Sequence, residues 1–286
     1  MLYALRNSVL FSIAFLVGTL LLAAPPEASA QEVSYAKHDY MKVPSGQAEA
    51  YLQLEQDLWK PIHRQRAEDG TIAGWNLYEV VYPAGADREY DYVTVTFYEE
   101  WDQLESPYET IDLEQIHPDK DPQEITQQTV EARRQVHSEV VEVIDSVTPE
   151  TEETDTEEAQ ESENGGYLVV DFMEVPSGGG SAYVQMEQDL FKPVHRQMIE
   201  QSGQQSWFLV ERQYADANDP YQYMTIQPYA SWSDVEPGTR SQAIESAFQE
   251  VHPDAVASEI GERVQETRTV VRREVWRLVD SVEPSE

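Results

Sequence analysis

The strongest alternation of hydrophobic and polar residues in the chain lies at residues 92–98 and predicts a β-strand. One face of this strand would carry Val93, Val95 and Phe97, and the other Tyr92, Thr94, Thr96 and Tyr98. Weaker alternations predict further strands over about 39–43, 75–81 and 138–147.

Apolar residues spaced three and four apart predict an amphipathic helix over about 48–68. Its apolar stripe would consist of Tyr51, Leu54, Leu58 and Ile62. Pro61 lies inside this helix, so we expect a kink near Trp59, because proline donates no backbone hydrogen bond and its ring crowds the preceding turn.

The whole pattern occurs twice within the 286 residues. The segment Tyr51–Gln65 (YLQLEQDLWKPIHRQ) recurs as Tyr183–Gln197 (YVQMEQDLFKPVHRQ). Shorter matches follow the same order: 41–46 with 173–178, Trp75 with Trp207, 98–101 with 229–232, 117–119 with 252–254, and 145–147 with 280–282. Collinear matches of this kind indicate an internal duplication.

Each copy is therefore expected to have the order β-α-β-β-α-β, which is ferredoxin-like within the α+β class. The second helix would begin at Pro122 and run to about Gln135, after short helical turns. We expect a first repeat over 34–148 and a second over 167–284, the second closing with a strand over 273–282.

Two segments fall outside the repeats. Residues 1–30 combine Arg6, an apolar run and the small-residue site Ala28–Ala30, which is the pattern of a secretory signal peptide. Cleavage would leave an exported protein, periplasmic or extracellular, without a stable membrane anchor; the alternative is an uncleaved anchor. Residues 149–166 are almost entirely acidic or polar, so we expect an acidic, disordered linker, or else an interaction tail for a basic partner.

Composition narrows the possible partners and chemistry. The chain has 54 acidic and 19 basic residues, a net charge of −35, and no cysteine. Such a charge repels nucleic acid, and the absence of cysteine excludes disulfides and thiolate chemistry. The acidic excess indicates either an ordinary solvated surface or a protein adapted to high salt, a halophilic one.

The repeat resembles the dimeric α+β barrel superfamily, which includes antibiotic-biosynthesis monooxygenase-like and stress-responsive barrel proteins. The resemblance rests on the turn Val43–Gly46, the helix Tyr51–His63, Trp75 and the strand Tyr92–Tyr98, and it covers nearly all of each repeat. In that superfamily two such sheets pair into one barrel, and ligand or haem pockets lie between a sheet and its helices. The resemblance therefore implies an intrachain pseudo-dimeric barrel in a monomeric protein.

Two histidines are the best candidates for chemistry. His63 and His195 recur in the same context, and a neutral imidazole there could act as a base, a haem ligand or a hydrogen-bond partner. The alternative is a histidine that only packs on the aromatic ring one turn earlier, Trp59 or Phe191.

Glu55 and Glu187 lie on the same helix face as these histidines, eight residues earlier. That spacing is about 12 Å of helix, which is too far for a glutamate and a histidine to share one metal ion. A second ligand would have to come from elsewhere, for example from His117 or His252. Both lie in a His-Pro-Asp sequence that fits a helix stop followed by a cap equally well, so we expect no metal site.

The polar-aromatic face of strand 92–98 recurs as Tyr223, Thr225, Gln227 and Tyr229, and it would either line a cavity or fill a barrel interior. The candidate pocket residues are His63, His195, Glu55, Glu187, Trp59, Tyr92, Tyr98, Tyr223 and Tyr229. The sequence thus predicts an exported barrel protein that binds a small hydrophobic molecule, and this protein could be an enzyme of the monooxygenase-like type. No motif identifies a cofactor, and haem is compatible with the predicted pocket. A non-catalytic structural or interaction module is the alternative.

Overall fold

The computed structural model describes residues 33–85, 87–105, 111–149, 166–216 and 219–283. By its internal contacts the chain divides into residues 1–30 and 31–286, and every described residue belongs to the second part. The expected signal peptide at 1–30 and all but the two end residues of the expected linker lie outside the described residues.

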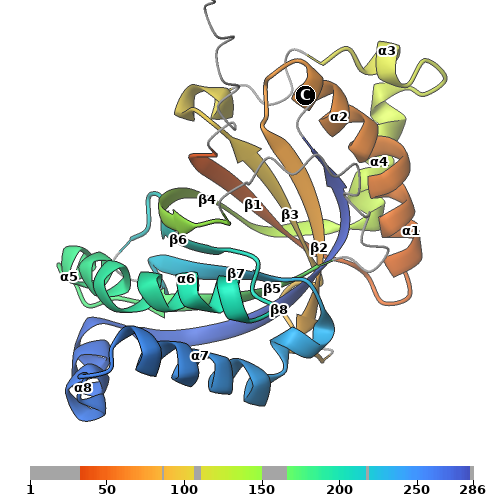
Figure 1. Ribbon diagram of the computed structural model, residues 1–286. Helices are drawn as coiled ribbons and strands as arrows, with labels where there is room; N and C mark the ends of the chain where they lie inside the picture. The colour runs from red at the N-terminus through yellow and green to blue at the C-terminus, as the bar shows by residue number, and fades with distance from the viewer. Residues whose placement is uncertain (1–32, 86, 106–110, 150–165, 217–218, 284–286) are drawn as a thin grey trace, which may run out of the picture. The chain divides into compact units, whose positions relative to one another are not determined.

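The two halves of the described part run through similar series of elements, with helices on the outside of a curved sheet (Figure 1). The first half contains β1 (Tyr35–Lys42), α1 (Ala48–Leu54), α2 (Lys60–Glu68), β2 (Gly74–Tyr82), β3 (Tyr92–Tyr98), α3 (Leu113–Ile116), α4 (Pro122–Ala132) and β4 (Arg134–Val147). The second half contains β5 (Tyr167–Glu174), α5 (Gly180–Met186), α6 (Lys192–Gln201), β6 (Trp207–Arg212), β7 (Tyr223–Tyr229), α7 (Pro237–Val251), α8 (Ala257–Thr267) and β8 (Thr269–Val282).

The strands close into an antiparallel barrel in the order β1-β3-β2-β8-β5-β7-β6-β4. Four neighbouring strands, β4-β1-β3-β2, come from the first half, and β8-β5-β7-β6 come from the second. The halves join where β2 pairs with β8 and β4 pairs with β6. Because the same order repeats after four strands, the two halves are related by an approximate twofold rotation about the barrel axis.

Ion pairs reinforce both junctions between the halves. Lys60 at the start of α2 pairs with Asp280 of β8, and Lys192 Nζ at the start of α6 lies 2.5 Å from Asp145 Oδ1 of β4. All four residues belong to segments that recur in both halves, and the two ion pairs give a structural reason for that recurrence.

The long helix near the start of each half is interrupted where the kink was expected. A π-helical turn, Glu55–Trp59, separates α1 from α2, and Glu187–Phe191 separates α5 from α6. In each case proline is the second residue of the helix that follows. A π turn is a common way to accommodate a local break in a helix, and such turns often occur at functional sites.

The boundary between the last helix and the last strand differs from the prediction. The helix α4 ends at Ala132 and not near Gln135, and β4 and β8 begin at Arg134 and Thr269, earlier than the expected 138 and 273. The strands start earlier because their first residues pair with the C-terminal ends of β1 and β5. A register shift in the β1–β4 pair and another in the β5–β8 pair precede these contacts. Residues 237–251 form α7, where only short helical turns were expected.

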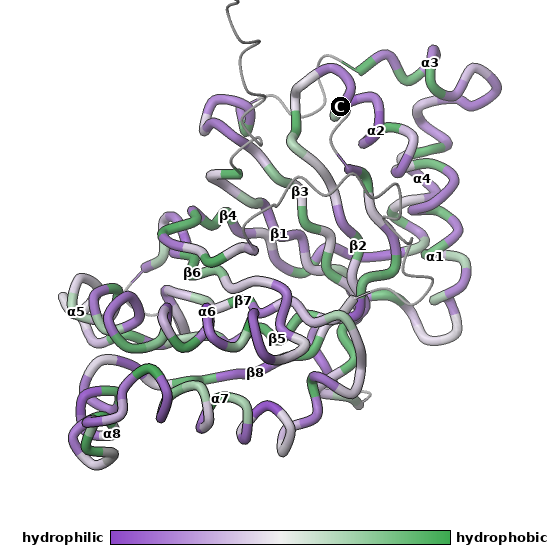
Figure 2. The backbone as a smooth tube through the Cα atoms, viewed as in Figure 1, coloured by the Kyte–Doolittle hydropathy of each residue, from purple (hydrophilic) through white to green (hydrophobic). Residues whose placement is uncertain are grey.

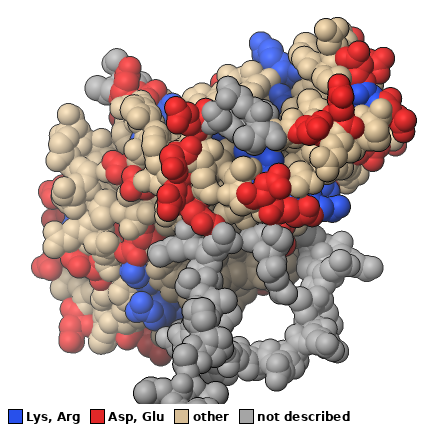
Figure 3. All heavy atoms as spheres, turned by 90° about the horizontal axis from the view of Figure 1, so that it is seen from above, with Lys and Arg blue, Asp and Glu red and all other residues tan. Residues whose placement is uncertain are grey.

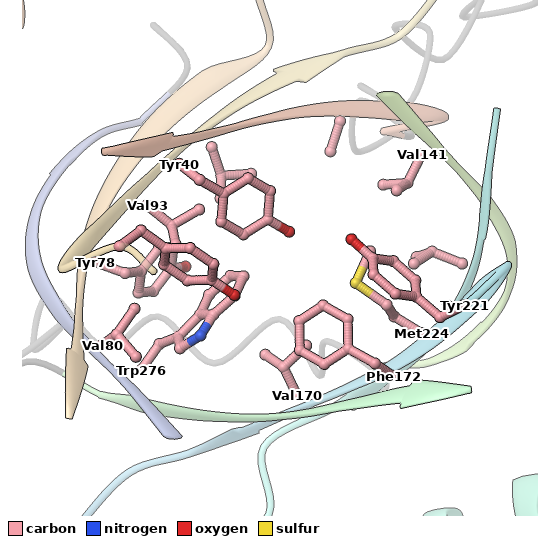
Figure 4. Packing of buried hydrophobic residues seen from close by; sticks show 14 residues of the cluster. Tyr40, Tyr78, Val80, Val93, Val141, Val170, Phe172, Tyr221, Met224 and Trp276 are labelled. Carbon is pink, nitrogen blue, oxygen red and sulfur yellow. The ribbon is translucent and has the colours of Figure 1, made fainter. Parts of the chain in front are cut away.

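The two faces of the sheet have different roles. Inward-facing residues such as Tyr78, Val93 and Trp276 fill the barrel interior (Figure 4). The opposite face of β3 turns to the helices, where Thr94 and Thr96 line a cavity. The interpretation of this face as the filling of the barrel is therefore wrong. Hydrophilic residues interrupt the otherwise hydrophobic β8 (Figure 2).

Candidate functional site

A cavity of ≈290 Å³ lies in the first half, between the outer face of the sheet and the helices. The residues Glu55, Trp59 and His63 line it from the helix that contains the π turn, and Thr94 and Thr96 line it from β3. A larger and more open groove of ≈620 Å³ lies between α1 and α4, but no buried titratable group lines it among the described residues. The smaller cavity is therefore the better candidate for chemistry.

Glu55, the first residue of the π turn, is a buried carboxyl at this cavity, with only 2% of its surface exposed. Its Oε1 lies 3.6 Å from Nε of Arg133, which ends α4 and also lines the cavity. Burial raises the pKa of Glu55 to about 7, although the nearby charge of Arg133 opposes the shift. Glu55 can therefore gain or lose a proton near neutral pH.

His63 is buried and stacks on Trp75, with ring centroids 4.8 Å apart and planes 11° from parallel. Its Nδ1 lies 3.2 Å from Nη1 of the buried Arg66. Burial and the nearby charge of Arg66 hold the pKa of His63 well below its usual range, so the imidazole is neutral. Since arginine only donates, Nδ1 accepts this hydrogen bond and the ring proton resides on Nε2.

The same group of residues recurs in the second half. Arg268 Nε donates to Glu187 Oε1 at 3.0 Å, and burial raises the pKa of Glu187 to about 7. His195 stacks on Trp207 at 5.2 Å, and burial lowers the pKa of His195 to about 4. The pairs Glu55–Arg133 and Glu187–Arg268 are therefore a duplicated feature of the fold.

The surroundings of the second group differ from those of the first. The position of Thr96 is occupied by Gln227, whose Oε1 accepts a hydrogen bond of 2.8 Å from Arg240 of α7. Arg240 is itself buried, and its Nε donates to Tyr229 Oη at 3.2 Å. Thr225 keeps the position of Thr94, so only Thr96 is replaced, by an amide that a buried guanidinium holds.

The predicted site residues separate into two groups. Glu55, Trp59 and His63 line one cavity, and Trp59 Nε1 also donates to Thr129 Oγ1 at 3.1 Å. The remaining predicted residues do not line it: Tyr92, Tyr98, Glu187, His195, Tyr223 and Tyr229. Tyr92 instead packs against the buried ring of Tyr51.

The arginines that pair with the two glutamates were missed by sequence reasoning. Arg133 and Arg268 lie at the boundary between a helix and a strand, where no periodic pattern marks a side chain as buried. Their recurrence at matching places in both copies was the signal that could have found them.

His117 and His252, considered as further metal ligands, bind the backbone. The Nε2 atom of each lies 3.0 Å from a carbonyl oxygen of a π turn, that of Leu58 and that of Leu190. Across the described ranges, no three His, Asp or Glu side chains are placed to hold a metal ion. The same residues include no helix long and apolar enough to cross a membrane.

Haem does not fit His63. An iron ligand must offer a nitrogen lone pair, but Nδ1 of His63 is engaged with Arg66 and Nε2 carries the proton of the neutral ring. The ring is also 4% exposed and stacked on Trp75, so a porphyrin cannot reach it without opening the core.

Acidic side chains dominate much of the surface around the fold. Viewed from above, Asp and Glu form broad groups, while Lys and Arg form a few smaller ones (Figure 3). The cavity differs from this surface because Lys37 and Arg133 line it together with Asp39 and Glu55. A neutral, polar-aromatic molecule suits such a balanced lining.

Comparisons with known proteins give similarity of structure only. No protein-family profile matches the chain, and no curated protein matches it. Among solved structures, the chain is similar to a protein proposed to be a monooxygenase from Fusobacterium nucleatum (8% identity, 88% of this chain and 95% of that chain covered, TM-score 0.49). It is also similar to a protein proposed to be a chlorite dismutase (10%, 87% and 95%, TM-score 0.47) and to a heme-binding protein from Thermus thermophilus (11%, 87% and 92%, TM-score 0.45). At these low identities and TM-scores, the similarities assign neither a ligand nor a reaction to this chain.

Proposed function

We propose that this chain is an exported α+β barrel protein that binds a small molecule in the cavity between β3 and the helices of its first half. The observation that carries the proposal is the convergence of Glu55, Arg133 and His63 on one cavity of ≈290 Å³. The carboxyl has a pKa near 7, and the imidazole is neutral and can donate from Nε2. These groups can orient a polar atom of a ligand and exchange a proton with it.

The resemblance to monooxygenase-like barrels makes oxidation of the bound molecule by dioxygen from solution the reaction to test first. The residues of the cavity supply binding, orientation and proton transfer, and Glu55 is the group that would move the proton. Arg133 positions Glu55, because it is the charged group nearest to that carboxylate.

The assembly we propose is a monomer in which two ferredoxin-like repeats pair as an intrachain pseudo-dimer. Its support is the strand order, in which each half supplies four adjacent strands and the last strand of each half also pairs with the other half. Export rests on the signal-peptide pattern of residues 1–30.

A structural or interaction module is the second candidate function. It is favoured by the barrel interior, which the protein's own side chains fill, including Tyr40, Phe172 and Trp276 (Figure 4). The module would need no ligand, and the buried Glu–Arg pairs would then serve only to hold α4 and α8 against the π turns.

The duplication supplies a matched pair of variants to separate the two functions. Glu55→Gln should weaken the binding of small polar-aromatic molecules, measured by thermal shift and calorimetry against a compound collection. Glu187→Gln removes the equivalent carboxylate in the second half and should leave binding unchanged. Equal effects of both variants, or no ligand for the wild type, would favour the structural module.

A further inference from the structure

A second polar cluster lies inside the barrel, around the approximate twofold axis, and the sheet–helix cavity does not include it. Two buried glutamates at equivalent places, Glu139 and Glu274, each accept a hydrogen bond from a tyrosine of the other half. Tyr90 Oη donates to Glu274 Oε1 at 2.8 Å, and Tyr221 Oη donates to Glu139 Oε2 at 2.7 Å. These crossed bonds make the cluster a joint product of the two halves.

The two glutamates have different further partners. Glu139 also accepts from Tyr40 Oη at 2.5 Å and pairs with Arg212 Nε at 2.9 Å. Although burial acts against it, hydrogen bonds from His137 and Tyr40 lower the pKa of Glu139 to about 2. Glu139 is therefore a fixed negative charge whose partners already satisfy it.

Glu274 is less well stabilised as an anion. It accepts from Trp276 Nε1 at 2.7 Å and lies 3.2 Å from Nε of Arg272. Burial raises the pKa of Glu274 above its ordinary value, and the charge of Arg272 only opposes this shift. Among the described residues Arg272 has this one carboxylate partner, whereas Arg212 has two, Glu139 and Asp219, each at 2.9 Å.

A cavity of ≈210 Å³ opens beside this cluster. Its lining includes Tyr40, Tyr90, His137, Arg212, Tyr221 and Arg272. Figure 4 shows Tyr40 and Tyr221 pointing their hydroxyls into the barrel at this level. The lining thus combines aromatic rings with two guanidinium groups.

Arg272 is held in a fixed position at this cavity. Its guanidinium carbon lies 4.0 Å from the ring centre of Phe172 and 5.6 and 5.7 Å from those of Tyr90 and Tyr221. Within the described ranges its only acidic partner is Glu274, which it meets through Nε, so its terminal nitrogens Nη1 and Nη2 pair with no described carboxylate. Two parallel N–H groups of this kind match the two oxygens of a carboxylate.

We propose that the barrel cavity is a second binding site, which takes a small monocarboxylate on the terminal nitrogens of Arg272 with the apolar part of the ligand against the rings of Tyr40, Tyr90 and Tyr221. The ligand would give Arg272 a second carboxylate partner, as Arg212 already has in Glu139 and Asp219. The acidic rim residues Glu89 and Asp219 limit the site to small, singly charged anions, because a larger charge would be repelled.

The neighbouring residue on β8 provides the control. Arg273 points to the other face of the sheet, where its Nη2 donates to Asp171 Oδ2 at 2.9 Å. Arg272→Gln and Arg273→Gln therefore remove the same charge from adjacent positions, one inside the barrel and one outside it.

The test titrates acetate, propionate and benzoate, each beside its neutral amide, into the mature full-length chain and follows binding by calorimetry at fixed ionic strength. We expect at least one carboxylate to bind and its amide not to bind, with affinity reduced about tenfold or more in Arg272→Gln and unchanged in Arg273→Gln. If Arg272→Gln does not fold, Arg272→Lys keeps the charge but not the paired donors, and it should weaken binding likewise.

Three results would overturn the proposal: no binding of any of the three carboxylates to the wild type, equal loss in the Arg272 and Arg273 variants, or equal binding of acid and amide. Loss of binding in Glu55→Gln alone would place the ligand in the sheet–helix cavity instead.

Discussion

The duplicated glutamates lead to a quantitative prediction about pH and stability. Burial raises the pKa of Glu55 and Glu187 from 4.5 to about 7. Both side chains are almost fully buried, so solvent screens little of the effect. At about 1.4 kcal/mol per pKa unit, each shift corresponds to about 3 kcal/mol of unfolding free energy.

The sign follows from proton binding. Between pH 4.5 and 7 the folded state holds protons on these carboxyls that the unfolded state has released, so their contribution to stability falls as pH rises. His63 and His195 act in the opposite direction, because burial lowers the pKa of each and the unfolded state binds the extra proton. In the wild type, the contributions of the glutamates and of the histidines to the pH dependence of the unfolding free energy therefore partly cancel.

Replacement of each glutamate by glutamine isolates the contribution of that carboxyl to the unfolding free energy. Glu55→Gln and Glu187→Gln should each gain stability relative to the wild type as pH rises, because the wild type loses its share while the variant does not. The difference should change by up to about 1.4 kcal/mol per pH unit and level off above pH 7.

Urea unfolding followed by circular dichroism, at fixed high salt and at several pH values from 4.5 to 7.5, measures this difference. The two sites lie in different halves, so their effects should add in the double variant. A difference between wild type and variant that is constant across this range would refute the assignment of raised pKa values to the two carboxyls.

Three further predictions concern charge, assembly and the barrel interior. The melting temperature should rise between 0.05 and 2 M sodium chloride, since salt screens a net charge of −35; a flat response would remove the argument for salt adaptation. Light scattering should give the mass of one chain, and a protease site inserted within residues 150–165 should leave the cut halves associated; their separation would contradict the intrachain pseudo-dimer. Tyr221→Phe should cost about 1.5–3 kcal/mol because it removes a donor to the charged, buried Glu139, whereas Tyr223→Phe removes a donor to the half-buried Glu211 and should cost less; equal costs would argue against the barrel cluster.

Sequence patterns predicted the positions of the helices and strands better than the tertiary contacts that these elements make. The alternation at 92–98 placed β3 and separated its faces, but a period of two does not say which face a barrel encloses. The apolar stripe placed the helix of Glu55 and His63, and Pro61 located its break. What remained hidden depends on tertiary contacts.

The residues that sequence reasoning missed are buried charges. In the sequence, Glu139 and Glu274 look like ordinary polar positions on strands where apolar and polar residues alternate. Only closure of the barrel turns them inward toward Tyr221 and Tyr90. Arg133 lies between two elements, and its burial follows from how α4 meets β4. Local periodicity carries no information about such cross-chain pairs.

The central claim is that the first-half cavity holds a small molecule. A native mass spectrum of the mature protein, purified from its own host, tests this most directly. The account predicts a small molecule on the wild type and on Glu187→Gln that is absent from Glu55→Gln. A bare chain mass for a folded wild type, or the same bound masses on both variants, would contradict it.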